Sequence, residues 1–299
     1  MKVIDIHAHV YERVAGITKG APMASDVLGK VKIGNQKLQF LPPSFERSAS
    51  TAEMLIAYMD WCGIEKALLM PNPYYGYHND YFLESVHRYP DRLRGVALVD
   101  LLKGKAAAEE LSDLYGHTDL FGFKVETDST FQCAPGKHMA DEEFLPVWDC
   151  VNQHRQPAFV HLFTDRDVED FQKLVRLFPQ ITWVVCHMGA DACFLPSTKK
   201  ENFRTLLQMV KTHGNVYMDT STVPVYYAEE YPFPTSVKIL EHAYHEVGAE
   251  KLMWASDYPG MLMHATMKQL IRLVEERCDI PYRDKERIMG ENAEHMFFS

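Results

Sequence analysis

Two histidines near the start of the chain are the first residues whose spacing suggests chemistry. His7 and His9 come directly after a short, mostly apolar run at residues 3–6, which is typical of a strand. Because side chains alternate along a strand, residues i and i+2 point the same way at its end. Two neutral imidazoles placed like this can bind one divalent metal ion. The pair alone is equally consistent with two structural histidines.

Three more metal-competent residues follow later apolar runs. His161 ends the run 158–160, His187 ends the run 183–186, and Asp257 follows residues 252–256. In a closed parallel barrel all strands end around one central hollow, where enzymes of this fold build their sites. These side chains would then converge. A jointly structural explanation accounts for about one such arrangement in ten, so the sequence favours a metal site.

The rest of the sequence supports such a barrel. Short apolar runs alternate with longer amphipathic stretches, as expected when each parallel strand is followed by a covering helix. Helices are expected from a capping box at residues 50–53 to Gly63, over 142–154, and around 168–178 and 237–247. Strands are expected at 3–6, 66–70, 94–99, 120–125, 158–161, 182–186, 215–218 and 252–255. This pattern predicts one α/β domain over residues 1–299, a distorted (β/α)₈ TIM barrel, rather than an open sheet.

The segment 11–49 is too long for an ordinary connection between a strand and a helix. Within it, residues 31–40 predict a hairpin turning at Gly34-Asn35, because glycine suits the first position of a type II′ turn. The segment directly follows the first strand. We therefore predict an insertion that acts as a lid or as a wall of the substrate pocket; the alternative is an ordered insertion without a role.

Composition limits the classes of partner. The formal charge is −10 and the chain has no basic patch, which argues against a nucleic-acid partner. A small anionic substrate is still compatible, since a few cationic side chains can dominate the field inside a pocket. The first residues lack the apolar run of a signal peptide or a membrane span, so a cytoplasmic location without membrane contact is expected. Six cysteines without a CxxC pair indicate buried thiols.

Five motifs, taken in order, resemble the amidohydrolase superfamily. The resemblance is to the amidohydrolase-related branch, which includes aminocarboxymuconate semialdehyde decarboxylase and several lactonases, and it runs nearly end to end. His295 stands where arginine is common in the family's terminal helix. The motifs are Asp5-Ile6-His7-Ala8-His9, Val160-His161, Cys186-His187-Met188-Gly189, Ala255-Ser256-Asp257-Tyr258-Pro259 and Glu291-Asn292-Ala293-Glu294-His295-Met296-Phe297.

The resemblance implies roles for the convergent residues. It makes His7, His9, His161 and Asp257 the metal ligands, with His187 beside the metal as a general acid or base or as an additional ligand. Zinc is the first choice for an imidazole-rich site with one carboxylate; manganese, iron and cobalt also suit these ligand types. Dimers are common in this branch, so a homodimer is a further expectation.

Lys124, at the end of the fourth expected strand, has three interpretations. In binuclear members of the superfamily a carboxylated lysine on that strand bridges two metals. We favour a lysine that binds a substrate carboxylate, over a bridging ligand and over a structural salt bridge. Weaker predictions for substrate contacts are Arg47, Tyr74, Tyr75, His78 and Tyr258.

The implied reaction is hydrolysis. Water activated by the metal would attack a lactone, ester or amide carbonyl of a small, carboxylated substrate. Asp257 would accept the proton, and His187 would stabilise the oxyanion or protonate the leaving group. The alternative is non-oxidative decarboxylation of an unsaturated or aromatic acid; several such enzymes carry glutamate where this chain has His7, which favours hydrolysis. A third hypothesis is a binding protein with a relic metal site.

Overall fold

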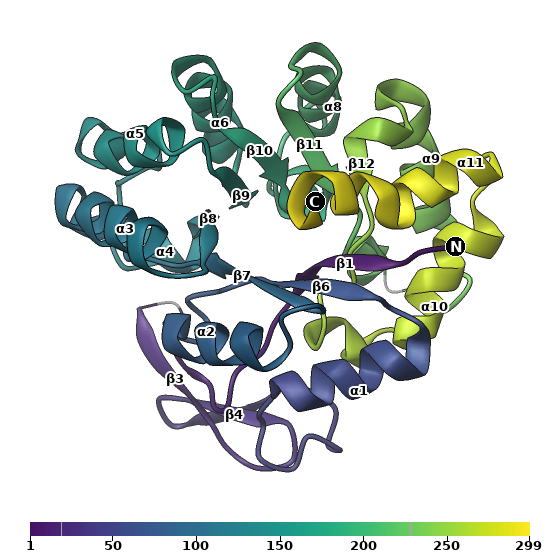
Figure 1. Ribbon diagram of the computed structural model, residues 1–299, viewed down its shortest axis with the longest axis horizontal. Helices are drawn as coiled ribbons and strands as arrows, with labels where there is room; N and C mark the ends of the chain where they lie inside the picture. Colours follow the sequence, from purple (N-terminus) through teal and green to yellow (C-terminus); the bar gives the residue numbers. More distant parts are fainter. Residues whose placement is uncertain (19, 228) are drawn as a thin grey trace.

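Eight parallel strands form a nearly closed barrel within residues 1–18, 20–227 and 229–299, the part of the chain that the computed structural model describes. The barrel closes through the Ile6 N–H, which donates to the Trp254 carbonyl at 3.3 Å, and the Asp257 N–H, which donates to the His7 carbonyl at 2.9 Å. The predicted fold is confirmed (Figure 1). In spatial order the strands are β1 (Ile4–Ala8), β6 (Lys66–Leu69), β7 (Leu93–Ala97), β8 (Phe121–Glu126), β9 (Pro157–His161), β10 (Thr182–Val185), β11 (Val216–Asp219) and β12 (Leu252–Met253).

Helices surround the barrel in the predicted alternation. The N-cap of the first helix is Thr51, one residue after Ser50, where the predicted capping box begins, because the Thr51 hydroxyl accepts the Met54 N–H. The helix ends at Gly63, which has a φ of +77°. Two short helices lie after the ends of β8 and β10, α4 (Thr127–Gln132) and α7 (Ala190–Phe194), and two more lie beyond β12, α10 (Met267–Arg272) and α11 (Tyr282–Glu286). The longer helices are α1 (Ala52–Cys62), α2 (Asn79–Arg88), α3 (Lys105–His117), α5 (Leu145–Gln153), α6 (Asp165–Leu177), α8 (Asn202–Thr212) and α9 (Pro234–Val247).

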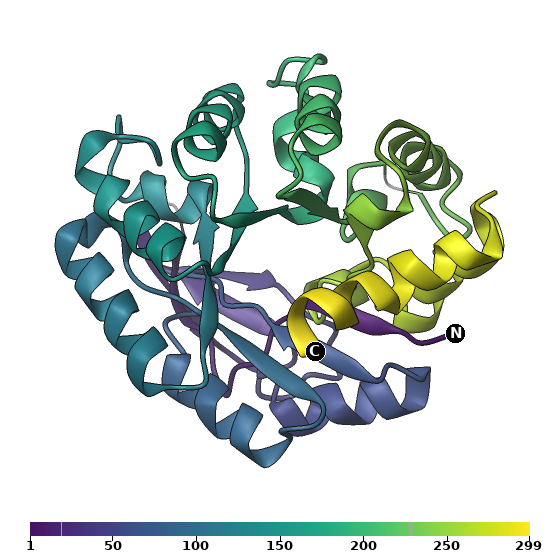
Figure 2. The same ribbon diagram turned by 45° about the horizontal axis from the view of Figure 1, so that its top comes forward.

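The C-terminal segment covers one end of the barrel. Figures 1 and 2 show it, in yellow, running beside β1. The Asn292 amide donates to the carbonyls of Ala249 and Leu252, which fixes the segment to the base of β12. The Phe297 ring packs 5.6 Å from that of Phe159 inside the barrel. The strands therefore surround an apolar plug at this end, and polar side chains gather at the other end, where the strands finish.

An irregularity in β1 turns the first histidines into the hollow. Ile4 and Ile6 belong to the apolar cluster inside the barrel, whereas Ala8 packs in the outer core between strands and helices. The register against β6 shifts between Asp5 and Ala8. Since a bulge exchanges the two faces of a strand, it is this shift that brings His7 to the inner side.

The insertion after β1 is an antiparallel sheet of β2 (Ala15–Thr18), β3 (Ala21–Ser25), β4 (Lys30–Ile33) and β5 (Gln36–Gln39). The predicted hairpin is confirmed, because Ile33 pairs with Gln36 across Gly34-Asn35. The β2–β3 hairpin was not predicted; its alanine, glycine and proline residues give no apolar alternation. Lys19, within the insertion, lies outside the described residues.

The insertion docks on the connection that follows β6. The Ala15 N–H donates to the Tyr75 carbonyl at 2.7 Å, and the Ile17 N–H donates to the Pro73 carbonyl at 3.1 Å. This connection leaves the carboxyl end of a barrel strand, so the sheet lies on the same side as the convergent histidines. A role as lid or pocket wall remains a prediction.

Gly16 gives a test of that role. A Cβ at this position would lie 2.1 Å from the carbonyl oxygens of Pro73 and Tyr74. We expect Gly16→Ala to push the insertion off its docking surface, to cost about 1–3 kcal/mol of stability and to raise KM more than it lowers kcat. Thermal unfolding and steady-state kinetics measure both effects. Gly116→Ala, in an open position of α3, is the matched control; an unchanged KM in Gly16→Ala would contradict a pocket-wall role.

Candidate metal centre

The two histidines at the end of β1 are oriented by hydrogen bonds on one side of each ring. His9 Nδ1 lies 2.5 Å from the Met70 carbonyl, so this nitrogen carries the hydrogen and Nε2 faces the hollow. His7 Nδ1 lies 2.9 Å from Asp219 Oδ2. His7 Nε2 is buried and has no hydrogen-bond partner among the described residues. Both rings therefore present Nε2 to the same space.

Asp257 faces these two nitrogens. Its Oδ1 lies 3.1 Å from His9 Nε2 and 4.0 Å from His7 Nε2. A buried nitrogen without a partner, close to a carboxylate and a second imidazole, is what a bound cation would satisfy. The residues present therefore fit a divalent metal ion.

His187 lies beside this group. His7, His187 and Asp257 each offer one ligand atom within 4.8 Å of the others. The backbone of His187 and Asp257 is left-handed, with φ of 56° and 54°. Such a conformation is costly for residues other than glycine and persists where the surroundings enforce it, frequently at functional sites.

His161 reaches the same hollow but has different partners. Its ring centroid lies 4.3 Å from that of His187. Nδ1 lies 2.9 Å from Glu126 Oε2, and Nε2 lies 2.6 Å from Asp191 Oδ2. Burial alone would lower the pKa of His161, but the two carboxylates outweigh it and raise the pKa to about 9.

The protonation states of His7, His187 and Asp257 suit a bound cation. Burial lowers the pKa of His7 and, more strongly, of His187, so both rings are neutral near pH 7. Burial would raise the pKa of Asp257, but its close contact with His9 and the neighbouring imidazoles hold the pKa well below its usual range. Neutral imidazoles beside an ionised carboxylate are the ligand forms of a divalent metal site.

The family follows from comparison of the whole chain. Residues 4–298 match the model of the amidohydrolase family. The chain belongs to this family. The family is a family of enzymes. The cluster of buried histidines and Asp257 is a candidate metal site of this amidohydrolase. No curated protein matches the sequence significantly.

Solved structures share the fold of this amidohydrolase at low identity. A probable 2-pyrone-4,6-dicarboxylic acid hydrolase from Acinetobacter baumannii, with citric acid bound, is 17% identical, with a TM-score of 0.69 over 100% of both chains. A 2,6-dihydroxybenzoate decarboxylase from Rhizobium is 16% identical, with a TM-score of 0.66 over 99% of this chain and 98% of its own. A 5-carboxyvanillate decarboxylase from Novosphingobium aromaticivorans, holding manganese and a nitrobenzoic acid, is 19% identical, with a TM-score of 0.62 over 82% and 79% of the chains.

Three carboxylates that hold the histidines, Glu126, Asp191 and Asp219, were not predicted from the sequence. Glu126 is the last residue of β8 and Asp219 the last residue of β11, so the strand-end argument applied to His161 would also have found them. Asp191 stands four residues after His187, in the first turn of α7. No sequence signal marks it, because its partner is set only by how that turn folds.

Lys124 and the residues that were predicted to contact the substrate lie in different surroundings. Lys124 is fully buried and its ammonium lies 3.3 Å from Glu126 Oε2, which supports the interpretation as an internal salt bridge. Arg47 is exposed, and no contact with the centre is described for it. The remaining side chains pack near the strand ends: Tyr74 donates to Asp128 at 2.5 Å, His78 bonds the Tyr75 carbonyl at 2.9 Å, and Tyr258 is buried against Tyr58.

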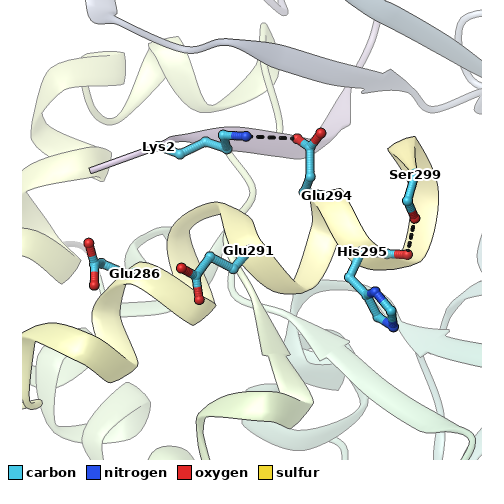
Figure 3. Close-up of a pocket in the computed structure, with 6 residues that line it drawn as sticks. All are labelled: Lys2, Glu286, Glu291, Glu294, His295 and Ser299. Atoms are coloured by element: carbon cyan, nitrogen blue, oxygen red, sulfur yellow. Dashed lines mark hydrogen bonds and ion pairs between the residues drawn. The ribbon is translucent and has the colours of Figure 1, made fainter.

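A cavity of about 400 Å³ lies away from this centre, at the opposite end of the barrel. It is lined by Lys2 and by residues of the C-terminal segment (Figure 3), and the Lys2 ammonium lies 3.4 Å from Glu294. Its glutamates are partly exposed, and Glu294 is also paired with Lys66 at 2.9 Å, so the cavity is separate from the histidine cluster. Among the described residues, none of the helices is long and apolar enough to cross a membrane.

Proposed function

We propose that this amidohydrolase uses one divalent cation, held by His7, His9 and Asp257, to hydrolyse a lactone, ester or amide bond in a small, carboxylated substrate. The observation that supports the proposal most is the unpaired, buried Nε2 of His7 beside Asp257. When bound, a divalent cation supplies a Lewis acid for carbonyl oxygens and makes water a nucleophile near neutral pH. Zinc suits this ligand set, and the manganese in a solved relative makes manganese the second choice.

Asp257 and His187 are the side chains placed to accept and to donate a proton. Asp257 Oδ2 accepts the Thr222 hydroxyl at 3.1 Å, so its carboxylate is held beside the hollow and can take a proton from the attacking water. The His187 ring, neutral and buried next to it, is placed to stabilise the oxyanion or to protonate the leaving group.

The substrate class is inferred from charge and from relatives. Solved relatives hold citric acid and a nitrobenzoic acid. In this chain Lys124 is neutralised by Glu126 and lies out of reach of solvent. Binding of a substrate carboxylate would therefore depend on the cation more than on Lys124. This differs from the sequence-based prediction that Lys124 binds that carboxylate.

Decarboxylation of an aromatic or unsaturated acid is the second candidate. It requires a proton delivered to carbon, and His161 is a charged ring, only 8% exposed, at the edge of the hollow. Several solved relatives are decarboxylases.

Product analysis separates the two reactions. The protein, supplied with zinc or manganese, is incubated with a panel of carboxylated lactones, amides and aromatic acids. We expect products whose combined mass exceeds that of the substrate by one water, with ¹⁸O from labelled solvent in the new carboxyl group. Release of CO₂ without added water would establish the second candidate instead, and a lack of turnover on the whole panel by metal-loaded protein would count against both.

A further inference from the structure

Three neighbouring strands of the barrel, β10, β11 and β12, are each followed by left-handed backbone at a residue other than glycine. The φ angles are +56° at His187, +67° at Thr222 and +54° at Asp257. A side chain makes this conformation costly, and for a β-branched residue such as threonine it is a rare outlier. Of the three residues, Thr222 therefore carries the largest steric cost.

The side chain of Thr222 joins the other two residues. Its Oγ1 lies 2.7 Å from His187 Nδ1, and its hydroxyl donates to Asp257 Oδ2 at 3.1 Å. Ser221 Oγ also lies 2.7 Å from His187 Nδ1, but its hydroxyl donates to Asp219 at 2.5 Å. Among the residues that the structure describes, Thr222 alone has a hydroxyl that contacts both His187 and Asp257.

The turn that holds Thr222 is anchored on both sides. Before it, the Thr220 N–H donates to the Met253 carbonyl at 3.0 Å, and after it, the Val225 N–H donates to the Thr222 carbonyl at 2.9 Å. Glycine would adopt this left-handed conformation without the steric cost. Strain of this kind persists where the surroundings enforce it, and it gathers at active sites. What threonine adds over glycine here is its side chain, whose hydroxyl makes the two contacts described above.

We propose that Thr222 is a positioning residue, whose hydroxyl holds the Asp257 carboxylate and the His187 ring at a fixed separation. This inference rests on the proposed function, in which Asp257 takes a proton from the attacking water and His187 serves the oxyanion or the leaving group. Both groups act on one reacting carbonyl, so their separation must match it. Thr222 exchanges no proton with the substrate, because it acts through the other two residues.

Three substitutions of Thr222 separate its hydroxyl from its backbone. Thr222→Ser keeps the hydroxyl, Thr222→Val keeps the branched shape without it, and Thr222→Gly keeps only the left-handed turn. We expect Thr222→Ser to retain kcat within about threefold, and the valine and glycine variants to lose about 10–100-fold in kcat with KM within about threefold of the wild type. Thr220→Val is the matched control, since the buried Thr220 hydroxyl has no hydrogen-bond partner among the described residues.

Crystal structures of the metal-free variants give a second readout that needs neither substrate nor turnover. In Thr222→Ser, the Asp257 carboxylate and the His187 ring should keep their wild-type positions. In Thr222→Gly, we expect one or both side chains to move by about 1 Å or to occupy more than one rotamer, because the hydroxyl between them is gone. Glycine suits the turn, so this variant should fold, and thermal unfolding checks that it does.

Two results would overturn the inference. If Thr222→Gly leaves Asp257 and His187 in their wild-type positions, the hydroxyl does not position them. If Thr222→Gly keeps kcat within about threefold of the wild type, the turn alone is sufficient and the hydroxyl has no role in turnover. Wild-type protein that hydrolyses nothing on the substrate panel would defeat the proposed function instead, while the crystal structures would still decide whether Thr222 holds the two side chains.

Discussion

Replacing Asp257 by asparagine is expected to lower kcat/KM by about 10²–10⁴-fold and to leave a folded protein. The substitution keeps the size of the side chain and its bond from Thr222, but removes the charge that faces His7 and His9. The amide also cannot accept a proton from water. Steady-state kinetics on the substrate found by the panel, together with thermal unfolding, measure both parts of the prediction.

The matched control for this prediction is Asp149→Asn, on the exposed face of α5. It should keep wild-type kinetics. If Asp257→Asn retained a near wild-type rate, the proton acceptor would lie elsewhere, and the proposed role of Asp257 would be wrong.

Replacing Asp219 by alanine is expected to have the largest effect on stability. The fully buried carboxylate accepts bonds from His7 Nδ1 at 2.9 Å, from the His187 N–H at 2.8 Å and from the Ser221 N–H at 3.1 Å. Alanine leaves these donors buried without a partner, which costs about 3–5 kcal/mol. It also frees the His7 ring to rotate, so we expect metal affinity to fall about 10–100-fold.

Urea unfolding of metal-free protein isolates the stability effect from the metal effect. Asp219→Asn retains one acceptor oxygen and should fall between the wild type and Asp219→Ala. A loss below about 0.5 kcal/mol in Asp219→Ala, the level of an ordinary surface substitution, would show that the carboxylate does not organise the two histidines.

The barrel and its convergent histidines could be predicted because both depend on local pattern. Each buried strand is a short apolar run, and a polar residue at its end must lie at the open rim once the sheet closes. His7, His161 and His187 all stand at predicted strand ends, and the structure brings these three rings together.

Contacts between distant segments could not be predicted in this way. The bulge in β1 and the left-handed turn at His187 depend on packing against neighbouring strands, and neither leaves a sequence pattern. The pairing of His161 with Asp191 joins two residues through folded geometry alone. The sequence therefore locates the site residues, while only the structure gives the side chains that contact each of them.

Anomalous diffraction from a crystal of this protein soaked in Mn²⁺ would show whether His7, His9 and Asp257 share one cation. We expect a single strong peak at the carboxyl ends of the strands, about 2.0–2.3 Å from His7 Nε2, His9 Nε2 and Asp257. A fully loaded crystal with no peak between these residues, or with its only peak elsewhere on the molecule, would contradict it.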